Sequence, residues 1–198
     1  MKGRGKLVLV VAPSGSGKDT LMEAAEAAFP DLATLTTCTT RAPRPGEEQD
    51  IDYHFFSREE FDRHIAEGDF LEWAEYGGNR YGTLRASIED VLARGEVLLA
   101  TIEVQGARRV RELLPASELV VIYIDAGGWE VLRRRICERA PIEESELEKR
   151  HERYLDEATY KEEATFVIAN PDGELEGAKR KFVSILADIR HEVAANVR

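Results

Sequence analysis

Cysteine is scarce in this chain, and its placement excludes the usual cysteine-based sites. Cys38 and Cys137 are the only two cysteines, and they lie too far apart for a C-x-x-C motif. We therefore expect neither a disulfide framework nor a zinc site built on cysteine. The four histidines also lack the spacing typical of metal ligands.

Long apolar runs and a surplus of positive charge are missing as well. No apolar run approaches membrane-spanning length, and the charged first residues lack the apolar centre of a signal peptide. We therefore expect a cytoplasmic protein that does not bind membranes. The formal net charge of −11 argues against a nucleic-acid-binding surface. A local arginine cluster can still bind an anionic small molecule.

What the chain does contain predicts one compact α/β unit over residues 1–198. Its 43% hydrophobic and 33% charged residues are typical of a soluble globular protein. Apolar runs at Leu7–Val11, Val97–Ile102 and Leu119–Ile124 predict buried strands. Helical segments alternate with these runs, which predicts a parallel sheet wound with helices on both faces.

Residues of about 38–90 interrupt this alternation and predict an inserted lobe, which divides the core into residues 1–37 and 91–198. Strands are expected at 34–40, 53–56 and 70–76, and turns at 77–79 and 81–83. Ser57 and Glu60 form a capping box that predicts a helix as far as about Glu67. Later helices are expected from about 146 to 163 and from 175 to 193.

The segment Lys6–Leu21 joins the first apolar run to a glycine-rich turn, a lysine and a helix. Such a turn directs backbone N–H groups and a helix N-terminus at an anion, and the lysine adds a positive charge. The motif departs from G-x-x-x-x-G-K-[ST], because Ala12 replaces the first glycine and Asp19 replaces the metal-binding hydroxyl. An ordinary strand–turn–helix is the alternative, but it leaves the agreement between the motif and its flanks unexplained.

Two arginines lie in a proline-rich loop between residues 39 and 47. Guanidinium groups bind phosphate through paired hydrogen bonds, so Arg41 and Arg44 can hold one phosphate group together with Tyr53 and Tyr81. Solvated surface arginines are the alternative. The neighbouring prolines restrict the loop and favour a site.

Glu72 is the one acidic residue with a specific chemical interpretation. A carboxylate can accept hydrogen bonds from N1–H and the exocyclic amine of guanine, whereas adenine has no donor at N1. From the residues alone, an exposed strand residue is the simpler interpretation of Glu72.

A basic segment ends the helix expected at Trp129–Arg139, and Arg150 follows the break at Pro141. In a phosphate-transfer enzyme, such a segment, at about 138–150, can act as a lid that excludes water. The alternative is a basic helix end that only complements the helix dipole.

Together these segments resemble the guanylate kinase family. The resemblance extends from Leu7 to about Phe182. Five segments occur in the family's order and approximate spacing: APSGSGK, TTRAPRPGE, DYHFF, FLEWAEYGGNRYGT and VQGARRV. The resemblance implies a P-loop NTPase-type α/β fold with a nucleotide-monophosphate-binding lobe and a helical lid. It also implies that ATP phosphorylates GMP and dGMP by direct in-line transfer with Mg²⁺.

The resemblance further implies roles for individual residues. The ATP-binding residues would be Pro13, Ser14, Gly15, Ser16, Gly17, Lys18, Asp19, Thr20 and Asn170. The GMP-binding residues would be Thr37, Arg41, Arg44, Tyr53, Glu72, Tyr81, Thr83 and Glu103. The catalytic residues would be Lys18, Arg44, Arg139 and Arg150. The protein would act as a monomer or homodimer.

Two departures from the family's pattern concern the metal. Asp19 replaces a serine or threonine, and Thr101 replaces the first acid of an Asp-x-Asp pair whose second acid is Glu103. Our hypothesis is that Asp19 helps to hold Mg²⁺, directly or through water, in place of the acid missing at position 101. Oxygen ligands suit Mg²⁺, which keeps several waters when bound.

Two other functions remain open at this point. Ribose 1,5-bisphosphate phosphokinase is similar in fold and typically has GKD in its loop, as this chain has at residues 17–19. Glu72 and the TTRAPRPGE segment argue against this sugar-phosphate kinase, because binding of a guanine nucleotide would explain both features. Guanylate-kinase-like scaffold modules bind phosphopeptides without catalysis, but they usually lack an intact phosphate loop, which here retains Lys18.

Overall fold

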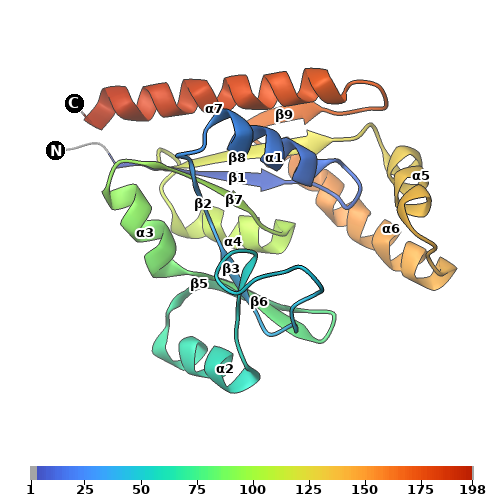
Figure 1. Ribbon diagram of the computed structural model, residues 1–198, viewed down its shortest axis with the longest axis horizontal. Helices are drawn as coiled ribbons and strands as arrows, with labels where there is room; N and C mark the ends of the chain where they lie inside the picture. The colour runs from blue at the N-terminus through green and yellow to red at the C-terminus, as the bar shows by residue number, and fades with distance from the viewer. Residues whose placement is uncertain (1–3, 198) are drawn as a thin grey trace.

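The computed structural model describes residues 4–197 and contains two sheets (Figure 1). Residues 1–3 and 198 of the expected unit lie outside the described residues. Within the described part, no helix combines the length and the apolar character that crossing a membrane requires.

The larger sheet has five strands in the order β2-β7-β1-β8-β9, and all its pairings are parallel. The strands are β1 (Lys6–Val11), β2 (Ala33–Thr34), β7 (Val97–Thr101), β8 (Leu119–Asp125) and β9 (Phe166–Ala169). β1 lies in the centre, and its apolar run is buried on both faces, as expected for a covered parallel strand. The predicted parallel α/β fold is therefore confirmed.

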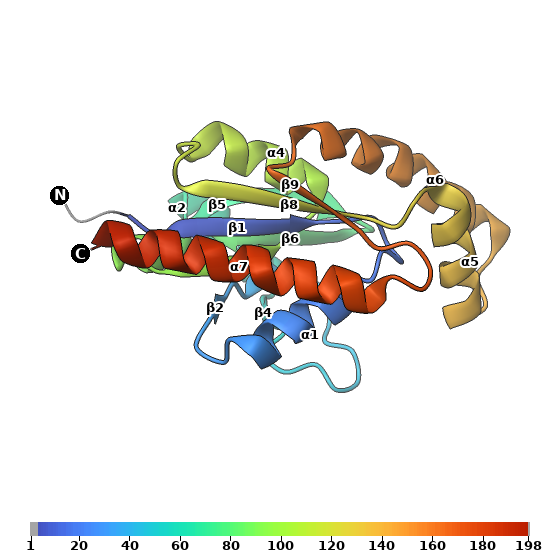
Figure 2. The same ribbon diagram turned by 90° about the horizontal axis from the view of Figure 1, so that it is seen from above.

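Helices cover both faces of this sheet. The helices of this part of the chain are α1 (Lys18–Ala28), α3 (Arg85–Ala93), α4 (Val104–Leu113), α5 (Trp129–Arg139), α6 (Glu144–Thr159), the 3-10 helix η1 (Tyr160–Glu163) and α7 (Leu175–Val197), of which α5 packs on α6 rather than on the sheet. Val8 and Val10 of β1 pack with α1 and α7, while Leu7 and Leu9 pack with α3 and α4. Figure 2 shows α4 on one side of the sheet and α1 and α7 on the other.

The smaller sheet has the strand order β4-β3-β6-β5 and mixed pairing. Its elements are β3 (Thr37–Thr39), β4 (Tyr53–Phe55), α2 (Arg58–Glu67), β5 (Phe70–Tyr76) and β6 (Asn79–Leu84). The predicted capping box begins α2, because Ser57 and Glu60 each accept a hydrogen bond from the other's backbone N–H. Phe61 and Phe70 stack at 4.3 Å between ring centroids and form the core of this part.

Four predictions about elements and their bounds were wrong. Residues 79–84 form strand β6 rather than turns, because they pair antiparallel with β5 beyond a short turn at Gly77 and Gly78. The single strand expected at 34–40 is divided between the two sheets as β2 and β3. The helix expected up to residue 163 ends at Thr159 and continues as η1, whereas the last helix extends beyond residue 193 to Val197.

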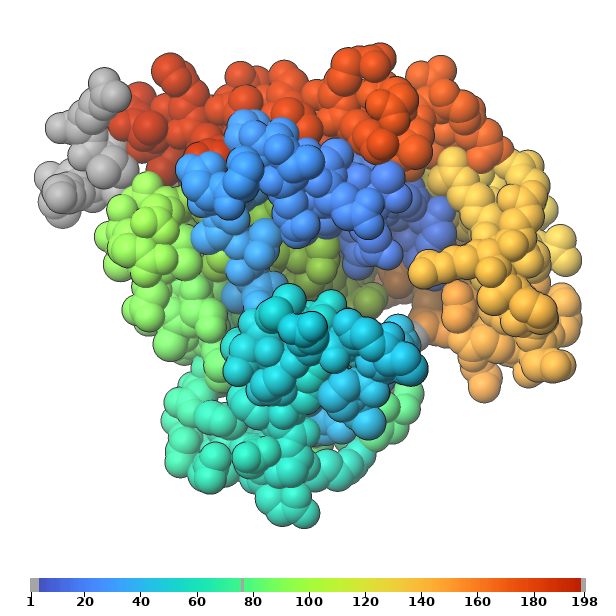
Figure 3. Space-filling view, viewed as in Figure 1, coloured from blue at the N-terminus to red at the C-terminus, as the bar shows by residue number. Residues whose placement is uncertain are grey.

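The two sheets border a hollow in the molecular surface. Figure 3 shows it between the smaller sheet, in cyan, and helices α5 and α6, in yellow and orange. The loop between β1 and α1 lies beside α5 and α6 (Figure 1). The carboxyl ends of β1 and β7 therefore lead to this hollow, which is where ligands bind in open α/β sheets.

Candidate functional site

The loop between β1 and α1 has the geometry of a phosphate-binding turn. Gly17 is the N-cap of α1, with φ of 86°, so the loop passes into the helix through a left-handed conformation that favours glycine. Lys18 begins the helix, and Asp19 is exposed in its first turn. The free N–H groups at this helix end make it a favourable place for an anion.

Asn170, which follows β9, holds this loop through its side chain. Its side chain is buried, and its Nδ2 donates a hydrogen bond to the Ser16 carbonyl at 2.7 Å. A Cβ added at Gly17 would lie only 2.5 Å from that Nδ2, so position 17 requires glycine for space as well as for φ. The Asn170 side-chain amide thus fixes the backbone of the phosphate loop at Ser16 and Gly17.

Arg135 of α5 supports the same loop from a second element. Its guanidinium donates to the carbonyls of Gly15 at 3.3 Å and Asn170 at 3.0 Å, and to the Asp172 carboxylate at 3.0 Å. The sequence indicated only that Arg135 belongs to a basic segment. Its partners are distant in sequence, so this role could not be predicted.

The proline-rich loop is organised by Glu47, which lies in the TTRAPRPGE segment but was not predicted to have a role. Its carboxylate accepts from the Arg44 backbone N–H at 2.7 Å and pairs with the Arg41 guanidinium at 2.9 Å. The Arg44 hydrogen bond, together with Arg41, holds the pKa of Glu47 below its usual value. Arg41 lies over the Tyr53 ring at 5.4 Å, whereas the Arg44 side chain is exposed.

Tyrosines complete this part of the site. The rings of Tyr53 and Tyr81 meet edge to face at 6.3 Å. Thr37 is the register partner of Tyr53 in the parallel pair β3–β4. Arg41, Tyr53 and Tyr81, which the sequence predicts to bind one phosphate group, therefore lie close together.

Glu72 is not an exposed strand residue. A bulge in β5 lies between Phe70 and Glu72, and it places Glu72 opposite Thr83, whose hydroxyl donates to the carboxylate at 2.7 Å. Burial raises the pKa of Glu72, and the Thr83 hydrogen bond opposes this shift. A Cβ added at Gly106 of α4 would lie 3.0 Å from the Glu72 carboxylate, so this glycine lets α4 pack closely against it.

Glu103 acts electrostatically on both the lobe and α6. It is the exposed N-cap of α4, two residues after the end of β7. Its negative charge contributes to the raised pKa of Tyr53, which is caused mainly by burial and by Tyr81. The same charge acts on Glu157 of α6. Glu103 thus connects the two sides of the hollow electrostatically.

Glu157 is a residue that the sequence analysis missed. Burial and the nearby Glu103 raise the pKa of its carboxyl group to about 7, against the opposing effect of Arg153 and Lys18. The sequence contains one indication that Glu157 lies near the site. It follows Arg150 by seven residues, which is about two helical turns and places both on the same helix face.

Arg150 reaches the phosphate loop, whereas Arg139 does not. The Arg150 Nη1 donates to the Ser14 hydroxyl at 3.4 Å, and its Nε donates to Glu146 at 3.2 Å. Arg139 is exposed at the end of α5. Trp129 stacks on His151 at 4.5 Å and joins α5 to α6 beside the loop.

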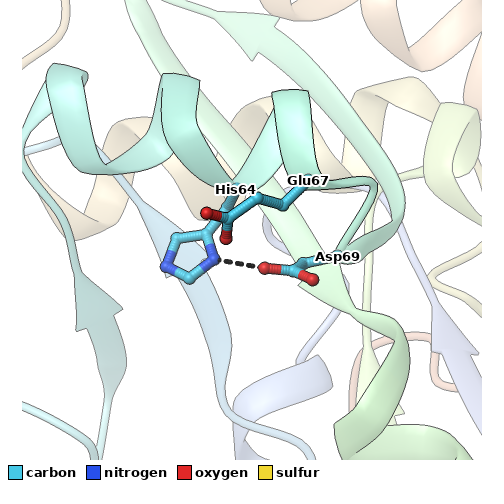
Figure 4. Close-up of side chains that lie close together, drawn as sticks. All are labelled: His64, Glu67 and Asp69. Carbon is cyan, nitrogen blue, oxygen red and sulfur yellow. Dashed lines mark hydrogen bonds and ion pairs between the residues drawn. The ribbon is translucent and has the colours of Figure 1, made fainter.

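A second group of potential metal ligands lies elsewhere, at the end of α2 (Figure 4). Asp69 bonds to the His64 Nδ1 at 2.7 Å, and Glu67 lies nearby. The His64 ring also stacks on Phe56 at 4.9 Å. The His64–Asp69 contact joins the last turn of α2 to the residue that follows its C-cap, Gly68.

Comparisons with known proteins identify the family. The family model described as Guanylate kinase matches residues 4–188. The chain belongs to the guanylate kinase family. It is 44% identical over 186 residues to the guanylate kinase of Rubrobacter xylanophilus, covering 94% of this chain and 95% of that protein. It is 42% identical over 169 residues to the guanylate kinase of Caulobacter vibrioides, covering 85% and 79%.

Solved structures agree with this family. The crystal structure of guanylate kinase from Anaplasma phagocytophilum matches with a TM-score of 0.72 and 29% identity, over 96% of this chain and 88% of that one. The predicted guanylate kinase family and P-loop NTPase-type fold are both confirmed. A sugar-phosphate kinase and a non-catalytic binding module are not favoured.

Proposed function

We propose that this chain is a guanylate kinase, an enzyme that transfers a phosphoryl group from ATP to GMP and dGMP. One observation carries this proposal beyond family membership. The smaller sheet, which carries the Glu72–Thr83 pair, and helices α5 and α6 border one hollow (Figure 3), and the charge of Glu103 acts on Tyr53 of the lobe and on Glu157 of α6. A phosphate donor and a guanine base can therefore be held on opposite sides of one reaction space.

We propose that ATP binds at residues 13–20. The N–H groups at the start of α1 and the Lys18 ammonium would bind its phosphates. Asn170 and Arg135 would act indirectly, because they hold the Ser16 and Gly15 carbonyls. With these carbonyls engaged, the loop keeps one conformation before the nucleotide arrives.

The GMP side is proposed to have two parts. Arg41, Arg44, Tyr53 and Tyr81 would bind the phosphate, with Thr37 beside them. Glu72 and Thr83 would bind guanine, since a carboxylate accepts from both N1–H and the exocyclic amine. Adenine has no donor at N1, so it would leave the partly buried Glu72 carboxylate with the Thr83 hydrogen bond but without the donors that guanine supplies, which disfavours AMP.

Transfer would follow closure of two parts of the chain, the lobe at about 38–90 and the lid at about 138–150. Closure would exclude water and bring Arg139 and Arg150 to the phosphoryl group. A GMP phosphate oxygen would attack the γ-phosphorus in line, forming the new P–O bond as the bond to ADP breaks. Lys18 and the arginines would stabilise the developing charge.

The acidic residues around Lys18 fit Mg²⁺. Asp19 is exposed in the first turn of α1, Glu103 is exposed at the N-cap of α4, the charge of Lys18 acts on Glu157, and all three offer carboxylate oxygen. We propose that Asp19 helps to hold the ion in place of the acid missing at Thr101. When bound, the metal would neutralise charge on the ATP phosphates.

The decisive experiment is ADP release from Mg-ATP with GMP, dGMP, AMP or ribose 1,5-bisphosphate as acceptor. We expect turnover with the guanine nucleotides alone. Turnover with the sugar bisphosphate would overturn the proposed substrate. Absence of turnover with all four acceptors would overturn the proposed reaction.

A further inference from the structure

His64, Glu67 and Asp69 bring one imidazole nitrogen and two carboxylate oxygens to a single place at the end of α2 (Figure 4). One ligand atom of each residue lies within 4.8 Å of those of the other two, and the His64 Nδ1 is 2.7 Å from the Asp69 carboxylate. Zn²⁺ bonds of about 2.0–2.2 Å place neighbouring ligand atoms roughly 3.0–3.5 Å apart. Small side-chain adjustments would therefore let one ion contact all three residues.

The fold holds two of these three residues in position. The His64 ring stacks on Phe56 at 4.9 Å and meets Phe70 edge to face at 6.0 Å. Gly68 ends α2 in a left-handed conformation, with φ of 74°, and so turns the chain back towards His64. The Asp69 N–H then donates to the His64 carbonyl at 3.1 Å. Ligands that are already in place lower the entropic cost of binding an ion.

Neither carboxylate of this group forms an ion pair with a lysine or an arginine in the described part of the chain. Asp69 pairs with His64 alone, and the Glu67 carboxylate has no hydrogen bond or ion pair there. A cation therefore has no basic side chain to displace. A divalent ion would at the same time compensate the charges of both carboxylates.

The mixture of ligands favours a transition-metal ion. Zn²⁺ binds imidazole nitrogen as well as carboxylate oxygen, whereas Mg²⁺ takes oxygen ligands. Three protein ligands leave the remaining position of a tetrahedral ion to water. The histidine spacing by itself did not indicate this site, because its other two ligands are carboxylates.

We propose that His64, Glu67 and Asp69 bind a divalent transition-metal ion, and that Zn²⁺ fits them best. The ion would join the last turn of α2 to the start of β5, three residues before Glu72. The Asp69 carbonyl also accepts from the Arg85 N–H of α3 at 2.8 Å. The ion would therefore stabilise the lobe where its strands lead into the core. This site is separate from the proposed kinase site and does not depend on it.

The test measures Zn²⁺ binding directly. Chelator-treated full-length protein is titrated with Zn²⁺ by calorimetry in excess Mg²⁺, which occupies sites made of oxygen ligands alone. We expect one ion to bind per wild-type chain at this site. In His64→Gln, the Kd should rise at least about tenfold, because loss of a direct ligand costs no less than loss of its outer-shell partner.

His54→Gln is the matched control. This histidine belongs to the same lobe and also pairs with an aspartate, Asp50, at 2.6 Å, but among the described residues the pair has no third ligand beside it. The variant should therefore keep the wild-type Kd. Glu67→Gln removes an exposed ligand and should weaken binding as His64→Gln does, which decides the question if His64→Gln does not fold.

Three results would overturn the inference. They are absence of Zn²⁺ binding to the wild type, an unchanged Kd in both His64→Gln and Glu67→Gln, and an equal loss of binding in His54→Gln. The titration contains no nucleotide, so none of these results bears on the proposed phosphorylation of GMP.

Discussion

Glu72 and Thr83 lie eleven residues apart in the chain but share a hydrogen bond of 2.7 Å across β5 and β6. This contact orients the carboxylate, and burial makes its interactions stronger than they would be in water. At the scale of the residue, the proposed guanine selection depends on the Glu72 carboxylate and the proposed metal binding on that of Asp19.

Replacing the proposed guanine-binding carboxylate should affect GMP selectively. In Glu72→Gln, an amide NH₂ replaces one acceptor oxygen and faces the base's donors, so we expect kcat/KM for GMP to fall about 100-fold. Steady-state kinetics with GMP measure this. Glu75→Gln, in the same strand but exposed, should have little effect. Unchanged efficiency in Glu72→Gln would exclude its role in guanine binding.

Asp19 and Thr101 should behave as a compensating pair. Asp19→Ser removes a proposed metal-holding carboxylate, so we expect a lower rate and a higher Mg²⁺ concentration for half-maximal activity. Adding Thr101→Asp should restore part of both, because it supplies the acid at the end of β7. Full activity with unchanged Mg²⁺ dependence in Asp19→Ser alone would contradict this role.

At the scale of the element, the phosphate loop depends on two segments that are distant in sequence. Arg135 of α5 and Asn170 at the end of β9 hold the carbonyls of consecutive loop residues, Gly15 and Ser16. The local sequence predicted the strand, turn and helix correctly, since that motif is contiguous. It could not predict the support beneath the loop, which depends on how α5 and β9 pack.

Removing this support should weaken ATP binding more than GMP binding. Arg135→Met deletes the donors to Gly15 and Asn170 while keeping much of the side-chain volume, so we expect KM for ATP to rise about tenfold. KM for GMP should stay close to the wild-type value. Arg133→Met, an exposed change in the same helix, is the control. Equal effects of both variants would mean that only the charge of α5 matters.

At the scale of the whole molecule, the site charges influence folding stability. The folded state raises the pKa of Glu157 from 4.5 to about 7, chiefly through burial, with Glu103 as the second cause. The folded state therefore binds this proton more tightly than the unfolded state. Stability contributed by the protonated form is present below about pH 4.5 and is lost as the pH rises through 7.

A comparison of pH profiles measures this contribution. Between pH 4.5 and 8, the free energy of unfolding of the wild type should fall relative to that of Glu157→Gln. We expect a difference of about 1–2 kcal/mol once solvent screening of a partly exposed group is included. Urea unfolding at several pH values provides the data. Parallel profiles for the two proteins would show that Glu157 is not perturbed.

The sequence by itself determined the central strands, the phosphate loop and the capped helix α2, because each depends on residues adjacent in the chain. The motifs also indicated the family, which the comparisons confirmed. Only the tertiary structure decided the pairing of Glu72 with Thr83, the support from Asn170, and the hydrogen bond of Arg150 to Ser14. These contacts join segments that are distant in sequence, and their geometry follows from the packing of helices and strands rather than from local preference.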